Sequence, residues 1–202
     1  ANIAGCANTV KILPDKSFKG YNTDIYGFRT AIPNSTRLND KKAGIIGTGG
    51  ASRAATVGLI QSGVKEINYY SRNIINSAAM INSMRESFPE IKFNNYPLQN
   101  IKDLSAISIL VNCTPVGMRG NSMDMMPITK YTLAQLPKDA IVYDVIYNPI
   151  KTLLLKEAEQ LGLETVSGLD MLIYQGAKAL EIWTGKMPDV QTMKIAALQE
   201  LY

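Results

Sequence analysis

The chain has 202 residues, of which 46% are hydrophobic and 19% charged, a composition that supports a packed core and lies far from that of disordered chains. The formal net charge is +4, but the excess of basic residues is scattered along the chain, so we expect no nucleic-acid partner. The apolar runs are too short to span a membrane, and the absence of histidine excludes His-based acid–base catalysis and most zinc enzymes, so we expect no metal.

The first part of the chain predicts two elements. Residues 17–23 have the composition of a strand, and residues 25–32 predict a helix closed by Pro33-Asn34-Ser35. The chain opens without the features of a signal peptide, and its first residues resemble the middle of a domain's sequence, not its beginning. The two cysteines have neither metal nor disulfide spacing, which fits a reducing cytoplasm. We therefore expect a cytoplasmic protein in which residues 1–23 end a domain that begins upstream.

From residue 42 onward, strands and helices alternate. The apolar run 42–46 leads into a glycine-rich turn and a helical stretch up to Gly63, a residue suited to the position after a helix end. A strand at 66–71 follows, so this part is a βαβ unit with parallel strands. The pattern predicts further strands at residues 91–93, 106–112, 140–145 and 163–166, and further helices at residues 74–88, 169–183 and 190–201.

One more helix is predicted between the last two strands, with Asn148 as its N-cap, Pro149 in its first position and Gly162 at its end. Six strands separated by helices predict an α/β fold with a doubly wound, Rossmann-type parallel six-stranded sheet.

The turn after the first strand of this sheet has the residue types of a phosphate-binding loop. Gly47 and Gly49 match the first two glycines of the dinucleotide-binding pattern, and Ser52 stands in place of the third. Glycines let backbone N–H groups approach a pyrophosphate, and the helix N-terminus adds partial positive charge. The next strand ends in Ser71-Arg72-Asn73 with no acid nearby. Because an NAD site usually has a carboxylate there, NADP is favoured.

Six motifs then occur in order. They are Ala7-Asn8-Thr9-Val10, Gly20-Tyr-Asn22-Thr23-Asp24-Ile-Tyr-Gly27, Gly47-Thr-Gly-Gly-Ala-Ser-Arg53, Asn112-Cys-Thr114-Pro115-Val-Gly117-Met118, Asp144-Val-Ile-Tyr147-Asn148-Pro149 and Gly168-Leu-Asp-Met171-Leu-Ile-Tyr-Gln175-Gly176. Together they resemble the shikimate dehydrogenase family along the whole chain.

The resemblance implies an enzyme that reduces 3-dehydroshikimate to shikimate with NADPH and without a metal, using a Lys–Asp pair. The family's aspartate falls on Asp24, and positions that bind the substrate fall on Asn8, Thr23, Tyr147 and Gln175. The implied cofactor residues are Gly47, Gly49, Gly50, Ala51, Ser71, Arg72, Asn73, Thr114, Val145, Gly168 and Met171. Residues 24–168 would be the NADP-binding domain with its connecting helix. Residues 1–23 and 169–202 would belong to the substrate domain.

In the family, the catalytic lysine and a pair of serines that hold the substrate carboxylate precede the first motif, and no lysine of this chain has a matching context. We therefore expect an N-terminally truncated chain that binds NADP(H) but turns over substrate negligibly, as a monomer or a homodimer. The helical spacing of Leu172, Leu180 and Trp183 predicts core packing.

Three other functions remain open. The first is a quinate/shikimate dehydrogenase that uses NAD, because Ser71, Asn73 and Asn76 depart from the family's common 2′-phosphate pattern. The second is an enzyme for another cyclic polyol acid, such as an aminoshikimate. The third is a non-catalytic nucleotide-binding domain, although such a domain needs only the glycine loop and would not need Asp24.

Overall fold

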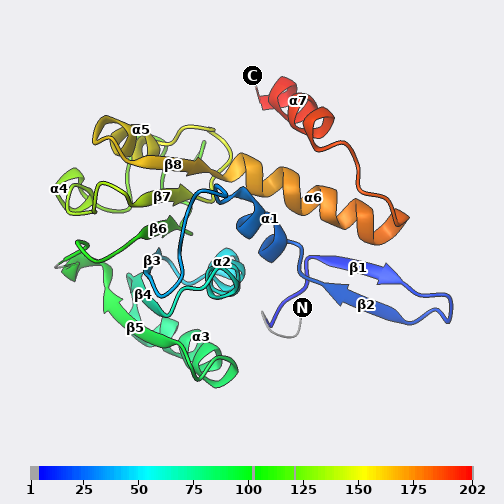
Figure 1. The fold of residues 1–202 in the computed structure, drawn as a ribbon, viewed down its shortest axis with the longest axis horizontal. Coiled ribbons are helices and arrows are strands. Elements are labelled where there is room, and N and C mark those ends of the chain that lie inside the picture. The colour runs from blue at the N-terminus through cyan, green and yellow to red at the C-terminus, as the bar shows by residue number, and fades with distance from the viewer. Residues whose placement is uncertain (1–4, 102, 121, 202) are drawn as a thin grey trace.

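The computed structural model describes residues 5–101, 103–120 and 122–201. Its centre is a six-stranded, wholly parallel sheet with the strand order β5-β4-β3-β6-β7-β8 (Figure 1). The strands are β3 (Lys42–Ile46), β4 (Glu66–Ser71), β5 (Lys92–Pro97), β6 (Ile109–Asn112), β7 (Ile141–Asp144) and β8 (Glu164–Ser167). This order confirms the predicted doubly wound α/β fold, in which the chain crosses from β5 to β6 and the strand order reverses between β3 and β6.

Helices cover both faces of the sheet because successive strand residues point to opposite faces. Ile45 and Tyr69 belong to one buried cluster, and their neighbours Ile46 and Tyr70 belong to the other. The helices that share the first cluster are α1 (Asp24–Ala31), α2 (Gly50–Gln61), α3 (Ile74–Ser87) and α6 (Gly168–Thr184). The second cluster includes buried residues of two shorter helices, α4 (Lys130–Leu133) and α5 (Leu153–Gln160). A further short helix, η1 (Leu98–Asn100), has no buried residue.

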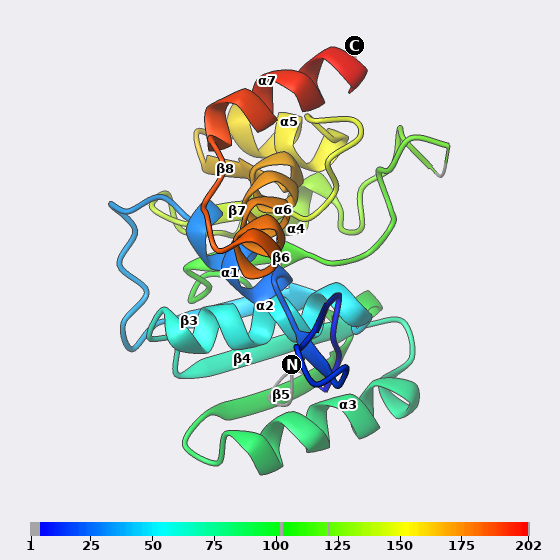
Figure 2. The same ribbon diagram turned by 90° about the vertical axis from the view of Figure 1, so that its right-hand side faces the viewer.

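Two elements lie outside this sandwich. Strands β1 (Thr9–Ile12) and β2 (Phe18–Tyr21) form an antiparallel hairpin that projects away from the large sheet, beyond α1 and beside the C-terminal part of α6 (Figures 1 and 2). Helix α7 (Val190–Leu201) follows α6 at the C-terminal end and has no buried residue. No helix among the described parts of the chain is both long and apolar enough to cross a membrane.

Several local predictions need correction. The strand expected at 17–23 is the shorter β2, and its partner β1 was not predicted because a short exposed strand exists only through its pairing. The expected strand 91–93 continues to Pro97, since the amides of Asn94 and Asn95 find hydrogen-bond partners on neighbouring elements. The expected strand 106–112 begins only at Ile109.

The helix expected to begin at Asn148 and Pro149 begins later. Thr152 is the N-cap of α5, and its hydroxyl accepts a hydrogen bond from the Leu155 amide, while Asn148 and Pro149 lie in the preceding turn and are joined by a cis peptide. Both Asn and Thr are good N-caps, so the local sequence did not discriminate between the two positions.

The prediction that Leu172, Leu180 and Trp183 pack in the core is wrong, since Leu172 is only half-buried and the other two are exposed. Leu180 is 37% and Trp183 52% exposed. The buried side of α6 instead carries Met171, Ile173, Ala177 and Ala179. The Trp183 indole donates a hydrogen bond to the Val10 carbonyl at 2.9 Å, which joins the end of α6 to the hairpin.

A close crossing of α1 and α6 depends on Gly27. A Cβ atom at this position would lie 2.5 Å from the carbonyl oxygen of Met171 and 2.9 Å from Cβ of Gln175. The absence of a side chain therefore lets the two helices approach, and this approach holds Asp24, one turn earlier on α1, near the first half of α6.

We expect Gly27→Ala to lower the free energy of unfolding by about 1–3 kcal/mol, the usual cost of overpacking, because the obstructing atoms include backbone. Urea denaturation measures the change. Gly176→Ala on α6 is the matched control, since its nearest contact would be an ordinary 3.5 Å to Met193, and it should stabilise the helix slightly. Equal stability of the Gly27 variant and the unaltered chain would contradict the tight crossing.

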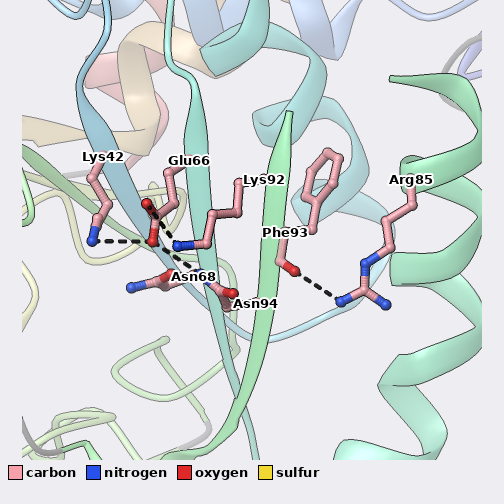
Figure 3. A network of polar contacts seen from close by, with 7 residues as sticks. All are labelled: Lys42, Glu66, Asn68, Arg85, Lys92, Phe93 and Asn94. Atoms are coloured by element: carbon pink, nitrogen blue, oxygen red, sulfur yellow. Dashed lines mark hydrogen bonds and ion pairs between the residues drawn. The ribbon is translucent and has the colours of Figure 1, made fainter. Parts of the chain in front are cut away.

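The amino ends of β3, β4 and β5 carry a polar network (Figure 3). Glu66 pairs with Lys42 at 3.0 Å and with Lys92 at 3.4 Å. The Asn94 amide donates to Glu66 at 3.0 Å and to Asn68 at 2.8 Å. Burial opposes ionisation of Glu66, but the two lysines outweigh it and lower the pKa of the carboxyl. The network joins three adjacent strands at the end of the sheet opposite to the site described next.

Candidate functional site

Two neighbouring cavities lie over the carboxyl ends of the strands. The first, of about 780 Å³, lies beside the point where the strand order reverses, between β3 and β6. The second, of about 480 Å³, lies between the hairpin region, α1 and α6. In open α/β sheets, ligands bind outside the carboxyl ends of the strands at such a reversal. A smaller cavity that touches Thr114, Val145 and Tyr147 has lining residues in common with both.

The structure divides the predicted residues between these cavities. The first is lined by Gly47, Gly49, Ser71, Arg72, Asn73 and Thr114. The second is lined by Asn8, Asp24, Tyr147 and Gln175, together with Gly50, Ala51, Val145, Gly168 and Met171. Thr23 lines neither, because it is buried beneath the second cavity with 1% of its surface exposed. Residues expected at the reactive end of the cofactor therefore share one cavity with those expected to hold substrate.

The glycine loop has the geometry of an anion site. Gly47 has φ +94°, and a Cβ atom there would lie 2.8 Å from Cγ2 of Thr114. By contrast, no atom lies within 4 Å of the Cβ positions of Gly49 and Gly50, so the backbone is open to the cavity. Gly49 caps α2 without any side-chain hydrogen bond. The first N–H groups of this helix are therefore available to a phosphate.

At the end of β4, two of the three predicted side chains already take part in hydrogen bonds within the protein. The Ser71 hydroxyl is buried and lies 3.1 Å from the Ser77 hydroxyl. The Asn73 carboxamide caps α3 by accepting from the amides of Ile75 and Asn76. Arg72 is exposed and is the one charged residue among the described residues that line the first cavity. It is therefore the natural partner for an anionic group there.

Asp24 begins α1 and faces the second cavity. Burial raises the pKa of this carboxyl, and the neighbouring Asn8 side chain partly offsets the effect. A carboxyl whose pKa is raised can hold and release a proton closer to neutral pH. Phe28 anchors α1 to the sheet, because its ring stacks on that of Tyr143 in β7 with the centroids 4.6 Å apart.

A chain of polar contacts joins three segments of the sequence around Asp24. The Asn8 Oδ1 atom accepts from the Thr23 amide at 2.8 Å. The Thr23 hydroxyl lies 3.2 Å from the same oxygen and 3.3 Å from Oε1 of Gln175. Thr23 thus orients Asn8 and Gln175 instead of lining the cavity itself.

Sequence reasoning missed several residues of the site. Leu98, Met125, Met126 and Pro127 add an apolar wall to the first cavity, and no local pattern marks them because they come from the short η1 and from the irregular segment before α4. Cys6 and Asn22 line the second cavity, where the Asn22 amide donates to the Cys6 carbonyl. Asn22 lies within one of the six motifs, so the motif contained the signal.

Cys113 follows β6 and lines the first cavity. Burial and the nearby charge of Asp144 raise the pKa of its thiol. A thiol with a raised pKa is a poor nucleophile.

Comparisons with known proteins agree with the site's arrangement. Residues 168–198 match the family described as the shikimate 5′-dehydrogenase C-terminal domain. The chain is 38% identical over 207 residues to the shikimate dehydrogenase (NADP(+)) of Methanocaldococcus jannaschii, covering 100% of this chain and 70% of that protein. It is likewise similar to a crystal structure of a shikimate dehydrogenase in complex with NADP+, with a TM-score of 0.87 and 38% identity over 100% of this chain and 69% of that one. Quinate dehydrogenase from Corynebacterium glutamicum in complex with NAD is 30% identical, with a TM-score of 0.87 over 98% and 70% of the two chains. The chain therefore belongs to the shikimate dehydrogenase family.

Proposed function

We propose that this chain is the cofactor-binding part of an NADP(H)-dependent oxidoreductase that interconverts shikimate and 3-dehydroshikimate. The observation that carries the proposal is the shared cavity of about 480 Å³, where Asp24 and Gln175 face Val145 and Met171 from the cofactor side. In domain terms, residues 24–168 bind the cofactor, and residues 1–23 and 169–202 belong to the substrate domain.

The residues of the first cavity suit a dinucleotide phosphate. Gly49 and Gly50 leave open space at the start of α2 for a pyrophosphate, and Arg72 supplies positive charge for a 2′-phosphate. When bound, NADP(H) supplies or accepts the hydride. Thr114 and Val145 line the smaller cavity that shares residues with both of the larger ones, and they would hold the nicotinamide end there.

The substrate residues would act by hydrogen bonding and proton transfer. We assign Asn8 and Gln175 to the substrate hydroxyls and Tyr147 to its carboxylate, and the buried Thr23 to the positioning of Asn8 and Gln175. Hydride transfer to a ketone leaves developing negative charge on the oxygen, which an acid or a cation must meet. Asp24 is the carboxyl of the acid–base pair in this proposal. No described residue that lines this cavity is a lysine, so we assign the pair's lysine to a segment outside this chain.

Cofactor choice should depend on Arg72. We expect Arg72→Gln to weaken NADP+ binding by about 10- to 100-fold, the loss typical of one charge-assisted hydrogen bond, and to leave NAD+ binding nearly unchanged. Titration calorimetry with both nucleotides measures this. Arg37→Gln removes the same charge from a distant cavity and should change neither affinity. An equal loss of affinity for NADP+ and NAD+ would contradict the role assigned to Arg72.

An NAD-dependent quinate/shikimate dehydrogenase is the second candidate. It is favoured by the internal hydrogen bonds of Ser71 and Asn73, which leave Arg72 as the one charged side chain of the three for a 2′-phosphate. The two candidates are distinguished by measuring kcat/KM for shikimate and for quinate, each with NADP+ and with NAD+. Highest kcat/KM with shikimate and NADP+ supports the first function, and preference for NAD+ supports the second. Nucleotide binding without turnover of either acid in the enzyme would indicate a non-catalytic domain.

A further inference from the structure

A buried polar cluster lies next to Thr114 and Ile146, which line the smaller cavity described above. Its centre is Asp144, the last residue of β7, whose side chain is fully buried. The carboxylate accepts three hydrogen bonds: one from the Thr152 hydroxyl at 2.7 Å, and one each from the Ile146 amide and the Asn112 carboxamide at 3.1 Å. No described residue forms an ion pair with it. A buried charge held only by neutral donors is costly, so its presence here calls for a functional explanation.

One branch of the cluster leads to the cofactor side. Asn112 is also fully buried, and its carboxamide oxygen accepts from both the amide and the hydroxyl of Thr114, at 3.0 Å and 2.7 Å. Its amide nitrogen is turned toward Asp144 and the Val116 carbonyl. Asp144 therefore determines which way the Asn112 carboxamide points, and this orientation determines where the Thr114 hydroxyl lies.

The other branch leads to the substrate side. Ile146, whose amide is bound by Asp144, accepts a hydrogen bond through its carbonyl from the Gly168 amide at 3.1 Å. Ile146 stands between Val145 and Tyr147, both of which line the second cavity. The same carboxylate thus connects the loop after β7 with the start of α6.

We propose that Asp144 is a positioning residue that fixes Thr114, through Asn112, and the 145–147 loop, through the Ile146 amide, so that the nicotinamide end of the cofactor enters the substrate cavity in one orientation. This inference rests on the proposed function. It concerns only the nicotinamide end, because the adenosine end would lie at Arg72, on the far side of the first cavity.

The test compares two ligands of the 202-residue chain. NADP+ reaches both ends of the site, whereas 2′,5′-ADP carries the 2′-phosphate but no nicotinamide. We expect Asp144→Ala to raise the dissociation constant of NADP+ by about tenfold, the effect of losing one hydrogen bond to a charged group, and to leave that of 2′,5′-ADP unchanged. Asp144→Asn keeps the shape and one acceptor oxygen, so it should fold even if the alanine variant does not, and should show a smaller loss for NADP+ only.

A double-mutant cycle tests the route through Thr114. In a Thr114→Val background, Asp144→Asn should cost less NADP+ affinity than in the unaltered chain, because the hydroxyl that it positions is gone. Glu66→Gln, which weakens the remote network of Figure 3, controls for general destabilisation and should change neither affinity. Equal weakening of both ligands, or additive effects in the cycle, would overturn the positioning role. Failure of the unaltered chain to bind either ligand would overturn the proposed function and this inference with it.

Discussion

Replacement of Asp24 by asparagine should lower the turnover of shikimate by the enzyme by about 10²- to 10⁴-fold, the usual contribution of a positioned acid–base group. Asparagine has nearly the same shape but cannot exchange a proton with the reacting oxygen. Affinity for NADP+ should stay nearly the same, since Asp24 is not among the residues assigned to the cofactor and does not line the first cavity, where Arg72 lies. Steady-state kinetics with shikimate and calorimetry with NADP+ measure the two effects separately.

The raised pKa of Asp24 adds a pH signature. The acid limb of kcat/KM in the unaltered enzyme should lie above the ordinary range of an aspartate and should disappear from the residual activity of the variant. Asp139→Asn, at the opposite end of the sheet, is the matched control and should keep full activity. Turnover of Asp24→Asn within threefold of the unaltered enzyme would exclude the assigned role.

The unaltered chain should lose stability relative to Asp144→Asn as the pH rises from about 4 to about 6. Burial raises the pKa of Asp144 from 3.8 to about 6, although the hydrogen bonds from Thr152, Ile146 and Asn112 oppose the shift. In this window the unfolded chain has released a proton that the folded chain still binds, so deprotonation favours unfolding. A shift of about two pKa units corresponds to about 3 kcal/mol.

Urea denaturation of both proteins between about pH 4 and pH 7 measures this effect. The free energy of unfolding of Asp144→Asn minus that of the unaltered chain should increase by about 3 kcal/mol across the window, because asparagine does not titrate. Other titrating groups are common to both proteins and cancel in the difference. Parallel pH profiles would show that Asp144 stays ionised at low pH and would contradict the raised pKa.

The sheet was predictable because its signals are local. The strand at Glu66–Ser71 has the predicted bounds, and Gly63, with φ +97°, takes the left-handed conformation expected after a helix end. Buried parallel strands are apolar throughout, and helices between them carry caps and breakers, so each element is recognisable within about a dozen residues. The glycine loop belongs to the same class of signal.

The failures come from choices that neighbouring residues do not decide. Helix α6 is apolar over most of its circumference, and only the position of the sheet determines that Ile173 is buried while Trp183 is 52% exposed. Strand β1 exists because β2 pairs with it. Asn148 and Thr152 are both competent caps, and the hydrogen bond from Thr152 to the buried Asp144 carboxylate favours the second.

By itself, the sequence determined the doubly wound sheet, the glycine loop and the set of motif residues, because periodicity, capping and turn chemistry act over short distances. Only the tertiary structure decided how those residues cooperate. Thr23 and Gln175 are 152 positions apart and meet because Gly27 lets α1 and α6 cross closely. Asp144 and Asn112 are 32 positions apart and meet because β6 and β7 pair in register. Packing brings these polar groups together out of reach of water, and there a missing hydrogen-bond partner becomes expensive and an orientation becomes unique.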